Sequence, residues 1–286
     1  MLTKNQLHIL LQRLVPQHLL SRLLGGLARC QTPWIKNQFI SWFVQQYQVD
    51  MSSALQPDPL QYPDFNSFFT RRLKPEARPI AFGEHNIICP ADGKISQLGN
   101  LEQNRILQAK NFDYDVTQLL GGDAERAQPF ANGRFITIYL APKDYHRVHI
   151  PYSGTLKEMV YVPGTLFSVN THTANTIPNL FARNERVVCL FDTAMGPMAV
   201  ILVGAIIVAS ISTVWAQTIA PSTLRQTITH RYTDNQIQLD QGEEMGHFMM
   251  GSTVIVVFAN QQVTWSPALS AGQSVQFGQK LGQINT

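Results

Sequence analysis

The chain has 286 residues, of which 44% are hydrophobic and 14% are charged, and it carries a net charge of +3. This length suffices for one large domain or two small ones with a sizeable core. The pI of about 8.8 reflects only a mild basic bias, which excludes a nucleic-acid binder. Because the charged fraction lies well below the ~25% usual for soluble proteins, we expect that much of the surface is uncharged or that part of it faces something other than water.

The N-terminal residues 4–29 have the pattern of amphipathic helices interrupted at Pro16. Leucines recur at helical spacing on both sides of that proline, at positions 7, 10, 11 and 14 and again at 20, 23, 24 and 27. Lysine and arginine occupy polar positions, and no acidic residue occurs before Asp50. A basic helix with a leucine face suits an anionic membrane surface. The alternative is that these leucines pack on the protein's own core. A secretory signal peptide is not expected here, because basic residues interrupt the segment regularly.

A third helix is predicted from Trp34 to about Val49. Residues 51–75 contain four prolines and predict loop and short helix. Phe65, Phe68 and Phe69 form an aromatic cluster within that stretch. A place in the core is favoured for this cluster over a membrane-facing edge.

Strand patterns begin at about residue 86, where β-branched and aromatic residues dominate. No charged residue occurs between Asp192 and Arg225, which is long enough to suggest a transmembrane segment. Because this stretch is rich in Val, Ile and Thr and is interrupted by glycine, we instead predict two buried strands joined near Gly204–Ala205.

The C-terminal segment has glycines at positions 272, 278 and 282 between short apolar runs, which predicts tight β-hairpins in a compact barrel or sandwich. The predicted fold class is therefore α+β. Amphipathic helices occupy residues 1–70 as a membrane-associating segment, and a β-rich, barrel- or sandwich-like catalytic body occupies residues 71–286. Three widely spaced cysteines without a Cys-x-x-Cys pair predict reduced, buried thiols in a cytosolic protein, with no metal site.

Three short motifs carry side chains suited to chemistry. Asp92 lies in Pro-Ala-Asp-Gly, which by itself is a turn signal. His146 and His149 are three residues apart, so a single helical turn opening at Pro142 would bring both imidazoles to one face. Ser252 lies in Met-Gly-Ser-Thr, without the Gly-x-Ser-x-Gly pattern of α/β-hydrolases. An aspartate that orients a histidine, which in turn deprotonates a serine, is a constellation that recurs on unrelated folds.

Five segments stand in a specific order along nearly the whole chain: PADGKI, DYHRVHIPYSG, LFSVNTHTANTIPNLFARNERVVCLFDT, GPMAVILVGAIIVASI and the Gly-Ser-Thr near the C-terminus. Together they resemble the bacterial phosphatidylserine decarboxylases. One local departure is Met250, where that family usually has leucine. This exchange nearly conserves volume, so we expect it to leave the chemistry intact.

The resemblance implies a proenzyme that cleaves itself between Gly251 and Ser252. The products would be a β chain of residues 1–251 and an α chain of residues 252–286, which remain associated. The first residue of the α chain would become a pyruvoyl group, the covalent cofactor. This group would form a Schiff base with phosphatidylserine and allow its decarboxylation to phosphatidylethanolamine, a step of phospholipid biosynthesis.

The resemblance also implies roles for individual residues. Ser252 would attack the Gly251 carbonyl, His149 would take the hydroxyl proton, and Asp92 would hold the imidazole in the correct tautomer. His146 is expected to return a proton to the substrate. The implied location is peripheral, on the cytoplasmic face of the cell membrane, with phosphatidylserine and an anionic membrane surface as partners. A homodimer is compatible with this picture.

Three rival functions stay open from the sequence. One is a serine hydrolase or amidase that uses Asp92, His149 and Ser252 without self-cleavage. Another is a membrane-associated β-barrel carrier of the lipoyl or biotinyl type, with Lys280 as the modified residue. The third is a metal-dependent enzyme that uses His146 and His149 as ligands.

Overall fold

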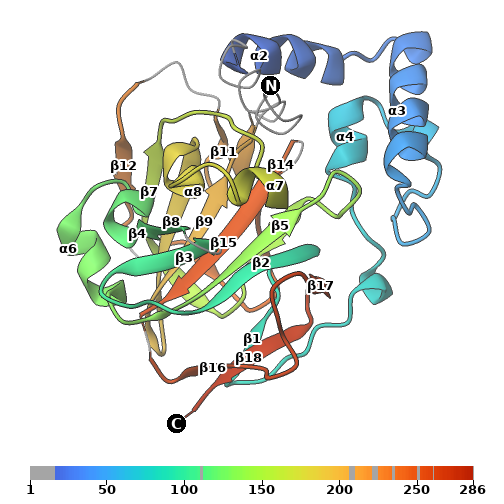
Figure 1. Cartoon of the computed structure of the whole chain (residues 1–286). Helices are drawn as coiled ribbons and strands as arrows, with labels where there is room; N and C mark the ends of the chain where they lie inside the picture. The colour runs from blue at the N-terminus through green and yellow to red at the C-terminus, as the bar shows by residue number, and fades with distance from the viewer. Residues whose placement is uncertain are drawn as a thin grey trace.

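The computed structural model of the chain describes residues 17–109, 112–205, 210–220, 225–233, 236–249, 252–259 and 261–285. It is an α+β structure, as the sequence predicts, with helices at the N-terminal end and strands in the body (Figure 1). The first part of the predicted N-terminal helices lies outside the described residues. The part after Pro16 is confirmed as helix α2 (Gln17–Ala28).

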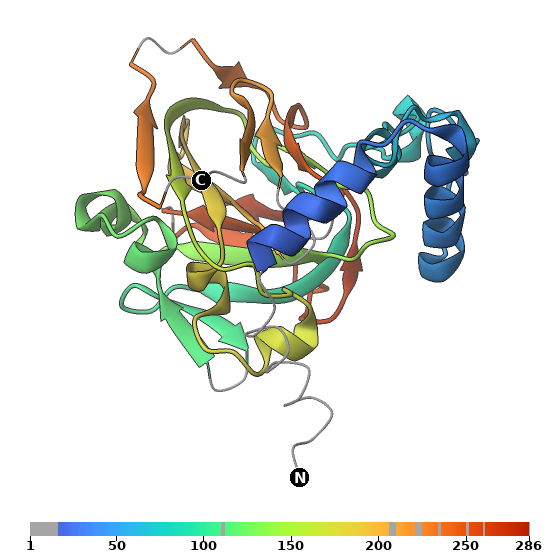
Figure 2. The same ribbon diagram turned by 90° about the horizontal axis from the view of Figure 1, so that it is seen from above.

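The predicted third helix is also confirmed as α3 (Pro33–Tyr47). It begins with proline, whose fixed φ and missing N–H suit the first helical position. The residue that caps its C-terminus, Gln48, adopts a left-handed conformation with φ 53°. Figure 2 shows that α2 and α3 lie beside the β-rich body rather than within it, with α3 farthest out. None of the described helices is long and apolar enough to cross a bilayer.

The segment that follows folds into short helical pieces around an aromatic core. These are the 3₁₀ turns η1 (Pro59–Gln61) and η2 (Pro75–Ala77), with helix α4 (Phe65–Phe69) between them. The side chain of Asp64 caps α4 by accepting a hydrogen bond from the Ser67 N–H at 2.8 Å. All three phenylalanines of α4 are fully buried and pack with Phe43 of α3. The favoured core position of this aromatic cluster is therefore confirmed.

The largest sheet has nine strands, and every pair in it is antiparallel. Its order is β12 (Ile228–Arg231), β7 (Gly154–Val162), β8 (Arg186–Thr193), β9 (Gly196–Val203), β15 (Ser252–Phe258), β5 (Arg134–Leu140), β2 (Gly93–Asn100) and β17 (Ser274–Val275), with β13 (Gln238–Leu239) also paired to β7.

Three smaller sheets complete the body. The four-stranded sheet has the order β11 (Gln217–Ala220), β10 (Ile211–Thr213), β14 (Glu244–Phe248) and β6 (Arg147–His149). The three-stranded sheet has the order β1 (Asn86–Ile88), β18 (Lys280–Ile284) and β16 (Val263–Trp265). The third is the hairpin of β3 (Arg105–Ala109) and β4 (Phe112–Asp115). All of these sheets are open, so a barrel, one of the two predicted architectures, is not formed. The large sheet ends at two short strands, β12 and β17, which do not pair with each other, and short edge strands limit edge-to-edge association.

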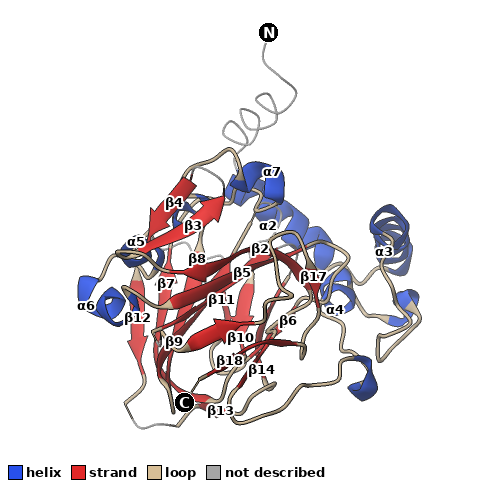
Figure 3. Cartoon of the chain, turned by 60° about the horizontal axis from the view of Figure 1, so that its bottom comes forward, coloured by secondary structure: helices blue, strands red, loops and turns tan. Residues whose placement is uncertain are grey.

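The large sheet is buried on both faces. One face packs against the two smaller sheets of four and three strands, and the other face packs beneath the β3–β4 hairpin and a set of short helices. Those helical pieces are α5 (Val116–Leu119), α6 (Ala124–Ala127), η3 (Gln128–Phe130), α7 (Thr171–Ala174) and α8 (Leu180–Arg183). Figure 3 shows the stacked strands at the centre and the helices around them. The three cysteines are free, with Cys89 and Cys189 buried as predicted and Cys30 only partly buried.

Two sequence predictions concern the strands of the second half. The uncharged stretch forms the two predicted strands on either side of Gly204, namely β9 and β10, but they belong to different sheets, and a third strand, β11, follows within the same stretch. The predicted tight C-terminal hairpins are wrong. Strand β18 pairs with β1 and β16, and β17 pairs with β2, because these short segments complete sheets begun by distant parts of the chain.

Strand β15 is the most enclosed element of the structure. It pairs with β5 on one side and β9 on the other. Val254, Val256 and Phe258 enter one hydrophobic cluster, while Ile255 and Val257 enter the cluster on the opposite face. All seven residues of the strand are at most 2% exposed.

This burial predicts a large cost for even a small truncation in β15. Val256→Ala removes two methyl groups and leaves a cavity, so we expect a loss of about 2 kcal/mol in the free energy of unfolding. The same exchange at Val214, which is 54% exposed, serves as the matched control and should change it by less than about 0.5 kcal/mol. Urea denaturation of both variants measures this difference, and equal losses would show that β15 is not a core strand.

Candidate active site

Ser252 is the first residue of β15 and lies opposite Leu140 of β5 in the antiparallel ladder. The residue is fully buried, and its Oγ has no hydrogen-bond partner among the described residues. A buried hydroxyl without a partner costs free energy, so such a group calls for an explanation beyond packing. Gly251, the other half of the predicted cleavage site, lies outside the described residues.

The loop after β5 carries both predicted histidines, but the predicted helical turn that would unite them is wrong. The loop closes a tight turn in which the Asp144 N–H donates to the Ala141 carbonyl at 2.9 Å and the Ala141 N–H donates to the Asp144 carboxylate at 2.7 Å. That turn ends before His146, and His149 belongs to strand β6. The two imidazoles therefore enter different surroundings, which disfavours their use as ligands of one metal ion.

His146 is fully buried beneath helix α4. Its ring stacks on Phe69 with centroids 4.0 Å apart, and its Nε2 lies 3.0 Å from the Ala141 carbonyl. A carbonyl only accepts, so Nε2 carries the hydrogen and Nδ1 has the lone pair. Nδ1 has no partner among the described residues. Burial, and secondarily the nearby Arg71 charge, lowers the pKa of His146 to about 3, which keeps the ring neutral.

His149 is held by contacts to both ring nitrogens. Its Nδ1 lies 2.8 Å from the Gly242 carbonyl and its Nε2 lies 3.0 Å from the Tyr145 hydroxyl. The ring stacks on Phe277 with centroids 3.6 Å apart. Burial lowers the pKa of His149 to about 4, so this imidazole is also neutral and has the protonation state of a base.

Asp92 occupies the turn before β2 and does not hydrogen-bond to His149. Its carboxylate instead forms a two-pronged ion pair with Arg78, with contacts of 2.5 to 3.1 Å, and accepts the Phe277 N–H at 2.9 Å. Phe277 thus links the two predicted triad members, because its amide binds Asp92 and its ring stacks on His149. The sequence did not single out Arg78, Phe277 or Gly242, since no spacing relates them to the motifs. Tyr145 could have been identified as a candidate site residue from the sequence, because it lies inside the histidine motif.

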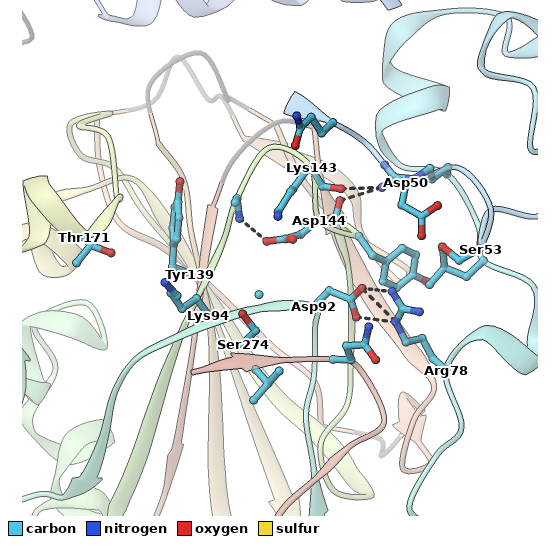
Figure 4. A pocket seen from close by; sticks show the side chains of 18 residues that line it. Asp50, Ser53, Arg78, Asp92, Lys94, Tyr139, Lys143, Asp144, Thr171 and Ser274 are labelled. Carbon is cyan, nitrogen blue, oxygen red and sulfur yellow. Dashed lines mark hydrogen bonds and ion pairs between the residues drawn. The ribbon is translucent and has the colours of Figure 1, made fainter. Parts of the chain in front are cut away.

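Two cavities border these residues. The larger, of about 550 Å³, is lined by Asp92, Arg78, Lys94, Tyr139 and other polar residues. Figure 4 shows Asp92 and Arg78 together at one side of it and Lys94 with Tyr139 at the other. The second cavity, of about 410 Å³, is lined by His149 and its neighbours. The larger cavity is lined by charged groups of both signs. The basic ones are Arg71, Arg78, Lys94 and Lys143, and the acidic ones are Asp50, Asp92 and Asp144.

The two neutral histidines predict that acid destabilises the protein. Histidine in an unfolded chain titrates near pH 6.5, whereas His146 and His149 have pKa values of about 3 and about 4 in the fold. Between those values the unfolded state binds more protons, so stability falls as the pH falls. For each unit by which the pH falls in this range, each histidine lowers the free energy of unfolding by up to about 1.4 kcal/mol. Urea denaturation of the Ser252→Ala chain between about pH 7 and about pH 5 measures this slope.

A variant of one histidine provides the control. His149→Gln should remove about half of the slope, whereas His230→Gln, at an exposed position of β12, should leave it unchanged. If both variants keep the full slope, the burial of His149 does not control the acid sensitivity.

Comparison with known proteins is in accord with the sequence and geometry. A family model described as phosphatidylserine decarboxylase matches residues 65–283, and one described as PSD matches residues 7–48. The phosphatidylserine decarboxylase proenzyme of Ectopseudomonas mendocina is 57% identical over 281 residues, covering 98% of each chain. The proenzyme of Pseudomonas putida is 56% identical over 281 residues, which cover 97% of this chain and 98% of the relative. The proenzyme of Pseudomonas fluorescens is 55% identical over 285 residues, which cover 99% of each chain. The chain therefore belongs to the phosphatidylserine decarboxylase family.

Proposed function

We propose that this chain is a proenzyme that cleaves itself between Gly251 and Ser252 and then decarboxylates phosphatidylserine to phosphatidylethanolamine. The observation that carries the proposal is the fully buried, unpartnered hydroxyl of Ser252 at the first residue of β15. A self-cleaving chain attacks its own preceding peptide bond, which adjoins this hydroxyl in the covalent chain, so its nucleophile can be buried. The names of the relatives, all phosphatidylserine decarboxylase proenzymes, support the same choice.

Self-cleavage begins when Ser252 Oγ bonds to the Gly251 carbonyl carbon while its proton passes to His149. The C–N bond breaks, the nitrogen gains a proton, and an ester joins Gly251 to the serine oxygen. Loss of the α-proton of residue 252 then breaks the Cβ–Oγ bond and releases Gly251 as a carboxylate. Water replaces the nitrogen as ammonia leaves, which gives a pyruvoyl group on residue 252. Glycine before the serine has no Cβ to obstruct the attack.

Asp92 acts on His149 as a positioning residue. Its carboxylate fixes the Phe277 amide, and the Phe277 ring in turn packs flat on the imidazole. The Gly242 carbonyl fixes the hydrogen on Nδ1. Together these contacts leave Nε2 as the basic nitrogen, which is the tautomer that proton removal from Ser252 requires.

Residue 252 is fully buried at the start of β15, so a pyruvoyl group at this position would be kept away from bulk water. The bound group supplies a carbonyl that takes up the substrate amine and accepts electrons as CO₂ departs. His146 supplies the proton for the substrate α-carbon. Its Nε2 hydrogen-bonds to the Ala141 carbonyl, and Ala141 directly follows Leu140, the residue that pairs with Ser252 in the sheet. Its Nδ1, which has no partner among the described residues, is the ring nitrogen available to carry that proton.

The α chain of residues 252–286 stays bound to the β chain after cleavage. Strand β15 remains hydrogen-bonded to β5 and β9, which both belong to the β chain. Strands β17 and β18 likewise pair with β2 and β1. Pairing in two sheets and burial on both faces retain the cofactor-bearing strand without a covalent link.

The protein acts as a peripheral protein on the anionic, cytoplasmic face of the cell membrane. The surface of α2 and α3 supports this location, since Leu23, Trp34 and Trp42 are 65%, 74% and 52% exposed. Tryptophan favours the interface between lipid and water, and large exposed apolar groups on neighbouring helices mark an interaction site. A homodimer stays a prediction.

The cleavage proposal predicts distinct outcomes for distinct residues. Intact-mass measurement of the denatured wild-type protein should give two chains, the smaller beginning at residue 252 and lighter than a serine-started fragment by one ammonia. Ser252→Ala and His149→Ala should remain single chains of about 32.1 kDa, because the nucleophile or the base is missing. His146→Ala should cleave but decarboxylate phosphatidylserine about 10²–10⁴-fold more slowly.

The control for these variants is His230→Ala, an exposed histidine on β12, which should match the wild type in both assays. Normal cleavage of His149→Ala would remove His149 from the role of base.

The membrane proposal predicts a loss of vesicle binding when the α2–α3 surface becomes polar. Leu23→Ser combined with Trp34→Ser should weaken co-sedimentation with vesicles of anionic phospholipid roughly tenfold or more, because both apolar groups leave the interface. Leu107→Ser, at a 44% exposed position on β3, is the matched control and should bind as the wild type does. Unchanged binding of the double variant would assign membrane contact to another surface.

A further inference from the structure

The basic nitrogen of His149 already has a partner. Because Nδ1 donates its hydrogen to the Gly242 carbonyl, Nε2 has the lone pair and accepts the hydrogen of the Tyr145 hydroxyl at 3.0 Å. Ser252 Oγ has no partner among the described residues. The base therefore contacts a tyrosine, and the nucleophile does not contact the base.

Tyr145 lies where it can connect the two. Its hydroxyl has one hydrogen, used on His149, and two lone pairs that can accept. The residue lines both the cavity of His149 and the larger cavity. The larger cavity is also lined by Ala141, the neighbour of Leu140, which lies opposite Ser252. Tyr145 thus contacts His149 directly and lines the same cavity as Ala141, the residue next to the strand position that pairs with Ser252.

We propose that Tyr145 relays the proton from Ser252 to His149 during self-cleavage, an inference that rests on the function proposed above. As the Ser252 O–H bond breaks, the proton bonds to the tyrosine oxygen, and the original tyrosine proton bonds to Nε2 of His149. The tyrosine gains and loses one proton, so it ends unchanged, and His149 ends as the imidazolium. The same path in reverse delivers a proton to the departing amide nitrogen.

The surroundings of Tyr145 suit a relay in which both protons move together. The residue is 6% exposed, and burial raises the pKa of its hydroxyl. A free tyrosinate is therefore costly at this position. Its ring packs near the imidazole that it serves, with centroids 5.7 Å apart, which keeps the hydroxyl aligned on Nε2.

The test is the rate of self-cleavage in Tyr145→Phe. The full-length chain is made by a short pulse of cell-free synthesis, and the appearance of the two product chains is followed by gel and mass. We expect cleavage at least about 10²-fold slower than in the wild type, as for loss of a positioned proton-transfer group. Tyr152→Phe is the matched control. Like Tyr145→Phe, this exchange removes a tyrosine hydroxyl that makes a hydrogen bond, in this case to the backbone carbonyl of Glu84. The variant should cleave at the wild-type rate.

Two further measurements separate a relay from a folding defect. Placing 3-fluorotyrosine at position 145 keeps the hydroxyl and makes it more acidic. A relay should then cleave faster than Tyr145→Phe but at a rate measurably different from the wild type, whereas a merely structural hydroxyl should give the wild-type rate. In mixtures of light and heavy water, the wild-type rate should show two protons in transfer and the residual rate of Tyr145→Phe only one.

The outcomes distinguish the two proposals. If the wild-type chain cleaves and Tyr145→Phe cleaves equally fast, the relay is wrong and the proposed function stands. If the wild-type chain itself does not cleave, the proposed function fails and the relay fails with it.

Discussion

The enclosure of strand β15 is the constraint on which the rest of the structure depends. It has a partner strand on each side and a hydrophobic cluster on each face. Ser252, its first residue, therefore has little freedom to move. A strand that starts at the reacting residue and is locked over its whole length combines two properties: it fixes the geometry of the reaction, and it retains the product once the chain is cut.

Around this fixed point, the site is assembled from segments that are distant in sequence. Asp92 comes from the start of β2, His149 from β6, and Phe277 from the C-terminal segment after β17. Phe277 contacts both of the others, since its backbone N–H donates to the Asp92 carboxylate and its ring stacks on His149. Burial acts together with these contacts, because it lowers the pKa of His149 and keeps the imidazole neutral.

What the sequence could predict follows from the range of each interaction. Helix α3 and the phenylalanines of α4 were predictable, since helical spacing and local aromatic density are short-range signals. The pairing of β17 with β2 was not, because its register joins Val275 to Gly93 and a two-residue strand has no pattern of its own. Asp92 presents the same problem at the site. Its motif signalled a turn and a candidate triad member, but its partners are an arginine in an irregular loop and a backbone amide, which no residue spacing encodes.

The N-terminal helical segment contacts the part of the body that carries the histidine motif. Phe69 of α4 stacks on His146, and the Arg71 guanidinium donates to the carbonyls of Lys143 and Asp144 in the loop before it. The Arg147 guanidinium, just beyond His146, donates back to the Thr70 carbonyl. The segment that follows the exposed leucine and tryptophan surface thus contacts His146 and the residues on either side of it. A displacement of α3 would therefore be transmitted to His146 through α4, because α4 packs on α3 on one side and on His146 on the other.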